Sequence, residues 1–334
     1  MKIIIDAMSG DKAPEEIVKG AVMARRELGV DVVLVGQQEV VKACLEAESC
    51  TDIEVVDARD VITMEDDPST ATRRKKDASM TVALNMLRDG SGDAVVSAGS
   101  TGALLTGATL IVKRITGIRR AALAPVLPNG GKGVVLIDSG ANVDCTPEYL
   151  LQFAYMGSFY ARTMLGLENP RVGLANVGTE DTKGGVLQHE TFQLLKAAGE
   201  AGRINFIGNV EGNGVFSGDV DVLVADGFTG NLMLKTAESM IKFMMCNLKS
   251  VFYKNLKNKL AAAVLKGDLA QMKKMLDVKE VGGTVMLGIS RPVIKAHGSS
   301  DARCILAAAR QAVTCVNSGI TEEIKANIEY MKIG

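Results

Sequence analysis

Short apolar runs alternate with longer segments in which apolar residues recur every three or four positions. The short runs near the start of the chain predict strands over residues 2–6, 32–35 and 53–56. The longer segments between them predict amphipathic helices over residues 15–28 and 37–47. Successive strands joined by helices run in the same direction, so the sequence predicts an α/β fold with a mostly parallel sheet. Helices on both faces would make this an αβα sandwich.

Five later apolar runs end in turns rich in Gly, Ser, Thr, Asn and Asp. In the clearest of them, residues 222–225 lead into the turn 226–231 and a helical run from Leu232, and Thr229 stands where a helix could be capped. The other four turns occupy residues 98–102, 139–142, 178–184 and 297–301. In a parallel sheet such turns share the carboxyl edge, where N–H groups at helix starts attract anions. Together the five turns predict a shared anion site, although any one of them also fits an ordinary turn.

The second half of the chain is predominantly helical. Its periodicity predicts a strand over residues 204–210 and helices over residues 147–165, 186–198, 300–316 and 321–331. A further helical segment runs from Leu232 to about Met275 and is broken at residues 266–268. We therefore expect a single α/β unit over residues 1–334, or two lobes that interleave, with an amphipathic helical hairpin protruding over residues 240–276.

The tip of this hairpin combines apolar residues with lysines. Its apolar residues are Phe252, Leu256, Leu260, Val264 and Leu265, and the first four recur every four positions. Lysines lie among them at positions 249, 254, 257 and 259. Such a helix can lie in a membrane surface, with these apolar residues as the contacts. A helix that packs on the core or on a second subunit shows the same pattern, so both interpretations stay open.

Composition and charge narrow the classes of function. The 334 residues are 47% hydrophobic and 23% charged, which is typical of a folded rather than a disordered protein. The net charge of −1 gives no overall signature for nucleic acid, so an acidic partner would have to meet a local basic patch. Two basic runs are candidates for such a patch: Arg73, Arg74, Lys75 and Lys76, and Arg119 and Arg120. A solvated basic face is the alternative for each run.

Several common kinds of site are missing from the sequence. The six Cys include no C-x-x-C pair and there are two His, so no metal site is expected. The usual dinucleotide, P-loop and hydrolase motifs do not occur, and we expect no cofactor. No signal peptide is visible, because the first apolar run stops at Asp6. No apolar stretch reaches the length of about 18 residues that a membrane span requires. The sequence therefore predicts a cytoplasmic protein with reduced thiols.

Eight segments together are similar to those of one known family. They are DAMSGDKAP at 6–14, RRKKDASM at 73–80, SAGSTGA at 97–103, DSGANVDC at 138–145, NVGTEDTKG at 176–184, NVEG at 209–212, DGFTGNLMLKT at 226–236 and KAHGSSDA at 295–302. Over essentially its whole length the chain resembles the bacterial phosphate acyltransferase (PlsX) family. The resemblance implies an enzyme that converts acyl-[acyl carrier protein] and inorganic phosphate into acyl phosphate, which feeds phosphatidic acid and phospholipid synthesis. It also implies an isocitrate/isopropylmalate-dehydrogenase-like fold, a homodimer, and peripheral association with the inner face of the cell membrane.

The attack of phosphate on a thioester makes modest demands on side chains. Phosphate dianion is itself the nucleophile near neutral pH, and a thiolate with a pKa of about 8.5 leaves readily. The site must hold the dianion against the carbonyl and stabilise the oxyanion of the tetrahedral intermediate. Backbone N–H groups at helix starts and one or two cations suit that task.

We assign these roles to residues of the strand-end turns. Lys183 would neutralise phosphate, and His297 would donate to the oxyanion or to the leaving sulfur unless it only stabilises its turn. Asn231 would orient phosphate, while Asp226 would brace its loop, since a carboxylate repels phosphate. The remaining phosphate-binding candidates are Gly99, Ser100, Thr101, Gly102, Gly227, Thr229 and Gly230.

Three other functions compete with this interpretation. A phosphotransacetylase-like acyltransferase would take its acyl group from acyl-coenzyme A. A decarboxylating dehydrogenase of the same fold would need a metal-binding carboxylate cluster and a dinucleotide site, and the sequence offers no convincing version of either. A membrane-surface scaffold would use the hairpin but would leave the five turns unexplained. With an acyl carrier protein as donor, the basic runs would meet its acidic surface.

Overall fold

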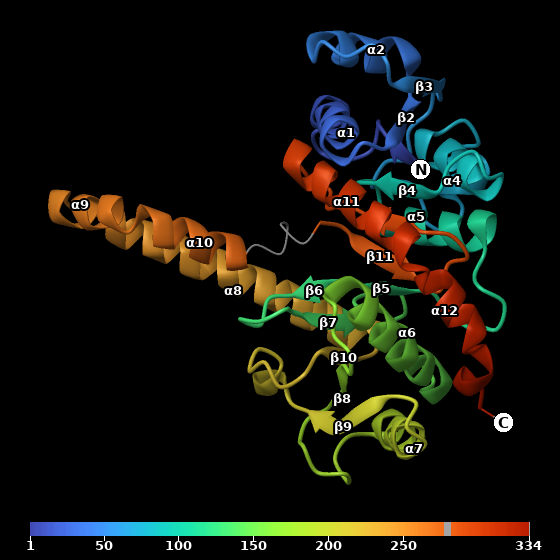
Figure 1. Cartoon of the computed structure of the whole chain (residues 1–334), viewed down its shortest axis with the longest axis vertical. Helices are drawn as coiled ribbons and strands as arrows, with labels where there is room; N and C mark the ends of the chain where they lie inside the picture. The colour runs from blue at the N-terminus through green and yellow to red at the C-terminus, as the bar shows by residue number, and fades with distance from the viewer. Residues whose placement is uncertain (277–281, 334) are drawn as a thin grey trace.

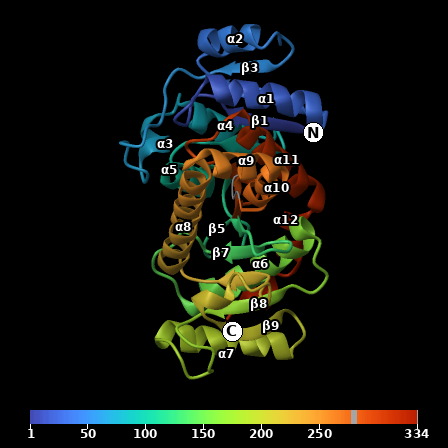
Figure 2. The same ribbon diagram turned by 90° about the vertical axis from the view of Figure 1, so that its left-hand side faces the viewer.

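The computed structural model describes residues 1–276 and 282–333. It has an elongated body from which a helical hairpin projects sideways (Figure 1). Helices α2 (Gln38–Ala47) and α7 (Val186–Glu200) lie at opposite ends of the body, and the hairpin leaves between them (Figure 2). The strands of the body form two sheets of seven and five strands.

The first sheet combines strands from both ends of the chain. Its order is β3-β2-β1-β4-β12-β11-β5, and every neighbouring pair is parallel except the two that involve β11. The strands are β1 (Lys2–Asp6), β2 (Asp31–Gly36), β3 (Glu54–Asp57), β4 (Ala94–Ser97), β5 (Ala122–Ala124), β11 (Thr284–Leu287) and β12 (Val293–Lys295).

Helices cover both faces of this sheet, which explains its continuous apolar runs. Ile3 and Ile5 belong to one buried cluster and Ile4 to another, because successive side chains of a strand point to opposite faces. Helices α1 (Glu15–Leu28) and α11 (Ala302–Ser318) pack on one face. Helix α4 (Ser79–Arg88) packs on the other, with α3 (Ala71–Arg74), α5 (Thr101–Gly107) and the π-helical turn Ala108–Val112 beside it.

The second sheet is built from the middle of the chain. Its order is β6-β7-β10-β8-β9, and only the β6–β7 pair is antiparallel. The strands are β6 (Val126–Leu127), β7 (Val134–Ile137), β8 (Arg171–Ala175), β9 (Asn205–Val210) and β10 (Val222–Val224). Helix α6 (Pro147–Leu165) and α7 pack on one face, and the base of α8 (Gly227–Tyr253) places Met233 and Leu234 against the other.

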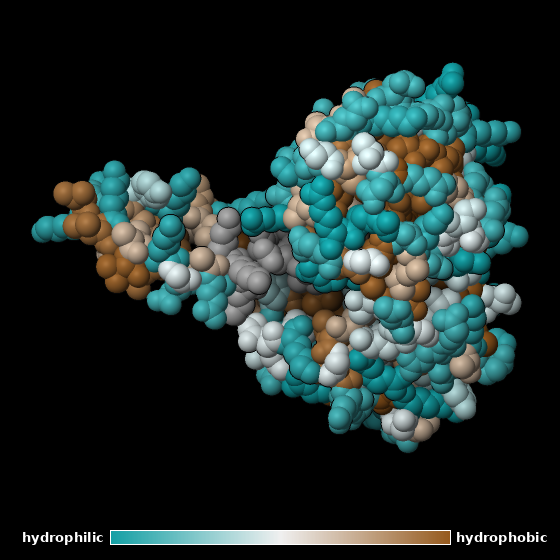
Figure 3. All heavy atoms as spheres, turned by 45° about the horizontal axis from the view of Figure 1, so that its top comes forward, coloured by the Kyte–Doolittle hydropathy of each residue, from teal (hydrophilic) through white to brown (hydrophobic). Residues whose placement is uncertain are grey.

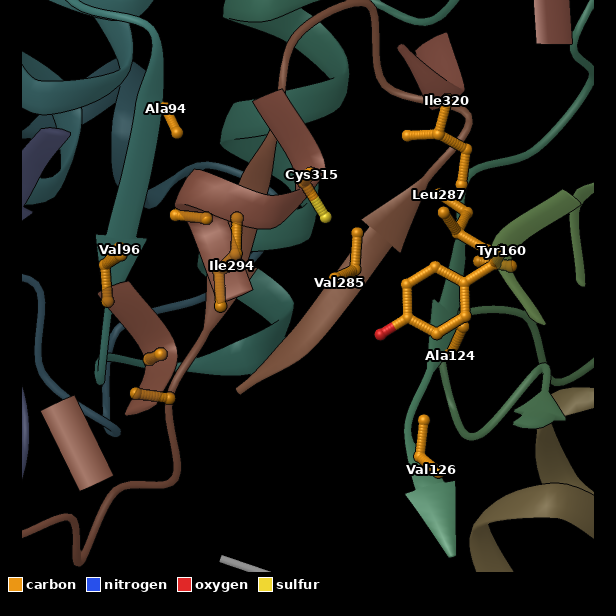
Figure 4. Packing of buried hydrophobic residues seen from close by; sticks show 14 of the residues in the cluster. Ala94, Val96, Ala124, Val126, Tyr160, Val285, Leu287, Ile294, Cys315 and Ile320 are labelled. Carbon is orange, nitrogen blue, oxygen red and sulfur yellow. The ribbon is translucent and has the colours of Figure 1, made fainter. Parts of the chain in front are cut away.

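The two sheets are joined at Pro125, which separates β5 of the first sheet from β6 of the second. They also share one buried cluster, in which Tyr160 of α6 lies near Leu287 of β11 and Ile320 of α12 (Ile320–Ala326) (Figure 4). The hydroxyl of Tyr160 accepts a hydrogen bond from Gln311 Nε2 of α11 at 2.7 Å. A polar group buried with its partner in this way aligns the helices of the two sheets.

The hairpin consists of the outer part of α8, which runs outward, and α9 (Leu256–Val264) and α10 (Lys266–Leu276), which return beside it (Figure 1). It stands clear of the body and carries apolar residues near its far end (Figure 3). Leu256, Leu260 and Val264 are 73%, 62% and 85% exposed, so the intramolecular packing does not cover them.

The α/β class, the mostly parallel strands and the hairpin extension are confirmed by this architecture. Two differences are informative. The strands are divided between two sheets, and the short strands β5, β6 and β11 were not predicted. The last helical segment is also shorter than expected, with a 3-10 turn at Ile328–Met331 after α12.

Candidate functional site

A cavity of about 550 Å³ lies where four of the predicted turns come together. It is lined by residues that follow β4 and β12 of the first sheet and β7 and β10 of the second. Its polar side chains are Thr101, Ser139, Asn231, Lys235, Glu238, Lys242, Thr284, Lys295, His297 and Ser300. The cavity therefore collects cations, hydroxyl groups and an amide from distant parts of the chain at the carboxyl ends of parallel strands.

The turn after β4 is held by the buried carboxylate of Asp6. Ser79 and Ser97 each donate a hydroxyl to it at 2.6 Å, and Ser97 Oγ also accepts the backbone N–H of Gly99 at 3.1 Å. Thr101 lines the cavity, whereas the Ser100 hydroxyl accepts from Ala103 N as the N-cap of α5.

The glycines of this turn serve packing. A Cβ at Gly99 would lie 2.5 Å from Met80 Cε, and one at Gly102 would lie 2.8 Å from Pro68 Cβ. Both glycines therefore leave room for neighbouring side chains whether or not phosphate is bound.

The turns after β7 and β10 are packed against each other. The buried Asp138 carboxylate accepts from Leu123 N at 2.9 Å and from Asn142 N at 2.7 Å, which ties the turn to β5. Burial raises the pKa of Asp138, and these backbone donors oppose the rise. A Cβ at Gly230 would collide with the carbonyl oxygen of Asp138, and one at Gly227 with that of Asn142. Glycine at these two positions lets the start of α8 approach the turn that carries Ser139.

Helix α8 begins earlier than its periodicity suggested. Asp226, not Thr229, is the N-cap: its carboxylate accepts from Thr229 N at 2.9 Å and from the Thr229 hydroxyl at 2.7 Å. The prediction of Thr229 as a cap is therefore wrong, and Asp226 braces its loop. Asn231 lines the cavity, while Thr229, two residues away and on the opposite side of the helix, lines a second cavity.

Lys295 lines the cavity, and its ammonium is held by backbone carbonyl groups. Its ammonium donates to the carbonyl oxygen of Ala98 at 3.3 Å and to that of Ala296. Burial lowers its pKa to about 8, while the carboxylates of Asp11 and Asp6 oppose this fall. Sequence reasoning missed Lys295, although a lysine closing the apolar strand Val293–Lys295 was a usable signal.

His297 and Ser300 follow Lys295 in the same turn. The backbone N–H of Ser299 donates to His297 Nδ1 at 3.1 Å, so the neutral ring carries its proton on Nε2. Ser300 is 1% exposed, lines the cavity, and its hydroxyl has no hydrogen-bond partner among the described residues. An unsatisfied buried hydroxyl facing a polar cavity favours a polar ligand there.

The backbone N–H groups at the starts of α8 and α11 contribute less to the anion site than the sequence predicted. At α11, Ala302 N donates to Glu16 Oε2 at 2.7 Å and Cys304 N donates to Asp301 Oδ1 at 3.0 Å. At α8, Thr229 N donates to Asp226 Oδ1 at 2.9 Å. Protein carboxylates occupy these groups, so side chains rather than helix ends supply much of the positive and donor character of the cavity.

Lys183 does not line this cavity. It is 49% exposed, and its ammonium lies 3.8 Å from Glu180 Oε1. Its turn follows β8, which is separated from β7 by β10. The turn that carries Lys183 therefore starts farther from the junction of the two sheets than the turns after β7 and β10.

The basic runs are only partly available to a partner. Lys75 is engaged inside the chain, 2.9 Å from Asp66 Oδ2 and donating to Val61 O at 2.8 Å. Arg73, Arg74 and Lys76 are exposed on or beside α3, which packs on α5. In the second run, Arg119 pairs with Glu148 at 3.0 Å and Arg120 lies 5.5 Å from the ring centre of Tyr149.

A second cavity of about 720 Å³ lies on the other side of α8. Its lining includes Phe216, Leu232, Met233, Ala237 and Met240. It borders the first cavity, because Ile241 lines both.

The chain matches a family model described as "Fatty acid synthesis protein" over residues 1–323. It is 45% identical to a phosphate acyltransferase of Oceanobacillus iheyensis over 330 residues, which is 98% of each chain. It is 46% identical to one of Geobacillus thermodenitrificans over 331 residues, covering 98% of this chain and 99% of the relative. This chain belongs to the phosphate acyltransferase family. It is therefore an enzyme that transfers an acyl group to phosphate, and phosphate is one of its substrates.

Solved structures of low sequence identity share the fold of this family member. A phosphotransacetylase from Streptococcus pyogenes matches with a TM-score of 0.62 at 17% identity, over 95% of this chain and 94% of the other. A 4-hydroxythreonine-4-phosphate dehydrogenase from Klebsiella pneumoniae matches with a TM-score of 0.54 at 14% identity, over 94% and 99%. These likenesses confirm the dehydrogenase-like αβα fold that the family resemblance implied.

Within residues 1–276 and 282–333, no helix combines the length and apolar character that a membrane span requires. In the same ranges, no three His, Cys, Asp or Glu side chains come together in a way that could hold a metal ion.

Proposed function

We propose that this acyltransferase takes a fatty acyl group from acyl-[acyl carrier protein] and transfers it to inorganic phosphate, giving acyl phosphate for phosphatidic acid synthesis. The observation that supports this most is the meeting of Lys295, His297 and Ser300 with Thr101 and Asn231 in one cavity. The same cavity has apolar walls, in which Leu123, Pro125, Val126, Leu234 and Met245 take part. A polar end for phosphate and an apolar wall for a hydrocarbon are what the two substrates require.

The polar end suits phosphate binding and attack. The Lys295 ammonium would neutralise the dianion, and the hydroxyls of Thr101 and Ser300 and the amide of Asn231 would fix its oxygens. A phosphate oxygen then attacks the thioester carbonyl carbon, whose oxygen becomes the oxyanion. His297 Nε2–H would donate to that oxyanion.

The tetrahedral intermediate then collapses and releases the thiolate of the carrier protein. The C–S bond breaks as the carbonyl re-forms, and the electron pair leaves with sulfur. The departing thiolate accepts a proton from the Lys295 ammonium, whose pKa of about 8 lies near the about 8.5 of a thiol. Matched proton affinities favour such a transfer.

Lys183 remains a proposed second cation for phosphate. In this structure its ammonium is paired with Glu180, so the role requires a different side-chain position. Its glycine-rich turn supports that movement, because a glycine follows it at position 184.

The carrier protein would dock on exposed basic side chains near the cavity. Arg73, Arg74 and Lys76 support this, since α3 packs on α5 and Thr101 at the start of α5 lines the cavity. Arg119 and Arg120 belong to the same proposal, whereas Lys75 would act mainly within its own loop.

The protein would act as a homodimer. Its hairpin is the proposed membrane element and would contact the inner face of the cell membrane. Exposed Leu256, Leu260, Val264 and Leu265 support membrane contact, while Phe252 is half-buried. Lysines 249, 254, 257 and 259 among them would meet anionic headgroups.

The donor is tested with purified protein, phosphate and a long-chain acyl carrier protein, with no metal or nucleotide added, by trapping acyl phosphate with hydroxylamine. A parallel reaction contains the matching acyl-coenzyme A, the donor of a phosphotransacetylase-like enzyme. We expect product mainly from the carrier-linked donor. Product only from acyl-coenzyme A would overturn the proposed donor and favour the second candidate.

A further inference from the structure

We propose that the fatty acyl chain leaves the phosphate cavity along the side of α8 and ends in the second cavity, so that this second cavity selects the length of the chain. The inference rests on the proposed function, because it assumes a long-chain acyl donor. It assigns the second cavity a ligand class, the hydrocarbon part of an acyl thioester or acyl phosphate.

Helix α8 separates the two cavities. Asn231, Lys235 and Glu238 line the phosphate cavity, and they lie on one face of the helix because they are three to four residues apart. Leu232, Thr236 and Met240 line the second cavity from the opposite face. The polar and apolar ligand regions are thus presented by two sides of one rigid element.

The cavities communicate along one edge of α8. Ile241 lines both of them. The chain segment opposite also lines both, since Pro125 and Val126 belong to the phosphate cavity and residues 128–130 to the second cavity. A chain that starts at Lys295 can therefore pass Val126 and Ile241 and continue between α8 and this segment.

The chemistry of the second cavity suits a hydrocarbon. Among its described lining residues none is charged, and Phe216, Met233, Ala237 and Met240 supply apolar surface. Met side chains are flexible and adapt to irregular apolar shapes, which suits a chain with many conformations. The phosphate cavity, in contrast, is bordered by Lys235, Glu238, Lys242 and Lys295.

A second subunit is a competing occupant, because Leu232 and Met240 are 58% and 53% exposed. Continuity with the phosphate cavity favours the acyl chain, since a subunit contact would have no reason to join the polar site at Ile241. The two occupants differ in what they predict: only an acyl chain makes the effect of filling the cavity depend on donor length.

The test is Ala237→Phe, which fills the second cavity from α8. Its matched control is Ser239→Phe, which adds the same side chain to an exposed part of α8 that lines neither cavity. Each methylene removed from water strengthens binding about fourfold, so excluding two or more methylenes should lower kcat/KM about tenfold or more. We expect this loss with palmitoyl carrier protein, a change below about threefold with hexanoyl carrier protein, and no selective loss in Ser239→Phe.

Phe216→Lys provides a second, independent test. Phe216 is 44% exposed, so a charge there is compatible with folding, and it should also lower long-chain turnover selectively. Equal loss with both donors, unchanged turnover with both, or dissociation of a dimer with loss of both activities would overturn the inference. Failure of the proposed function has a different signature: the wild-type protein would form no acyl phosphate from either carrier-linked donor.

Discussion

Replacing Lys295 by methionine is expected to make the protein less active but more stable at neutral pH. The ammonium is held in a partly buried position, and burial lowers its pKa from the ordinary 10.5 to about 8. The folded state therefore disfavours the charge that the proposed mechanism uses. Methionine has similar length and carries no charge, so it removes both the cost and the function.

The magnitude follows from the pKa. Each tenfold change in proton affinity corresponds to about 1.4 kcal/mol, so a fall from 10.5 to about 8 costs roughly 3 kcal/mol before solvent screening at the cavity mouth is considered. The carbonyl oxygens of Ala98 and Ala296 lose a donor, which offsets about 1 kcal/mol. We expect a net gain of about 1–2 kcal/mol in the free energy of unfolding. Loss of a charge-assisted contact to phosphate should lower kcat/KM for phosphate about 10- to 100-fold.

The pH dependence of the stability difference between wild type and Lys295→Met distinguishes a buried charge from a simple packing effect. Between pH 8 and 10.5 the unfolded state binds more protons than the folded state, so wild-type stability rises with pH in that window. Below pH 8 the penalty is fully present. The stability advantage of Lys295→Met should therefore be largest below pH 8 and shrink towards pH 10.5.

The assay is urea unfolding of wild type and Lys295→Met at several pH values between 6.5 and 10, together with phosphate kinetics at pH 7. Lys183→Met is the control for stability, because Lys183 is 49% exposed and its ion pair should contribute less than about 1 kcal/mol. A stability difference for Lys295→Met that does not change with pH would refute the buried-ammonium argument. Normal phosphate kinetics in a folded variant would refute its role at the site.

Four other expectations can be checked independently. Asp6→Asn should lower the unfolding free energy by about 2 kcal/mol in urea titrations and raise KM for phosphate, since an amide cannot accept both seryl hydroxyls as the carboxylate does. Lys183→Met should reduce turnover in a folded protein; near-normal turnover would remove that residue from the mechanism. Leu260→Glu with Val264→Glu should abolish liposome co-sedimentation while sparing turnover in solution, and unchanged sedimentation would return the hairpin to subunit packing. The KM for carrier protein should rise steeply with salt if exposed cations of the run 73–76 dock it, whereas a flat response would indicate apolar docking.

Local elements could be predicted because their signals lie within a few residues. The strand Lys2–Asp6 and the helix Glu15–Leu28 have the bounds that periodicity indicated. The helical hairpin was also predictable from its local apolar repeat, but the predicted break at residues 266–268 is wrong: these residues begin α10, and the chain reverses at residues 254–255, between α8 and α9. The start of α8 was missed because Asp226 and Thr229 are both suitable caps, and only the folded backbone brings the Asp226 carboxylate to Thr229 N.

Which turns meet could not be predicted from the turns themselves. The turns that carry Lys183 and His297 have similar composition, yet only the second lines the cavity. The order of strands makes the difference. His297 follows β12, which pairs with β4 in the first sheet, and the turn after β4 also lines the cavity. Lys183 follows β8, which lies two strands beyond β7 in the second sheet, roughly 10 Å away at the usual strand spacing.

The sequence by itself determined the α/β class, the strand-end turns, the apolar hairpin and, through long motifs, the family. Each of these depends on neighbouring residues or on their order in the chain. Tertiary structure decided that Lys295 rather than Lys183 lines the cavity, that carboxylates occupy donors at the starts of α8 and α11, and that two cavities meet at Ile241. The physical reason is that burial and charge pairing are set by segments far apart in the sequence, which only the crossing of the chain between two sheets brings together.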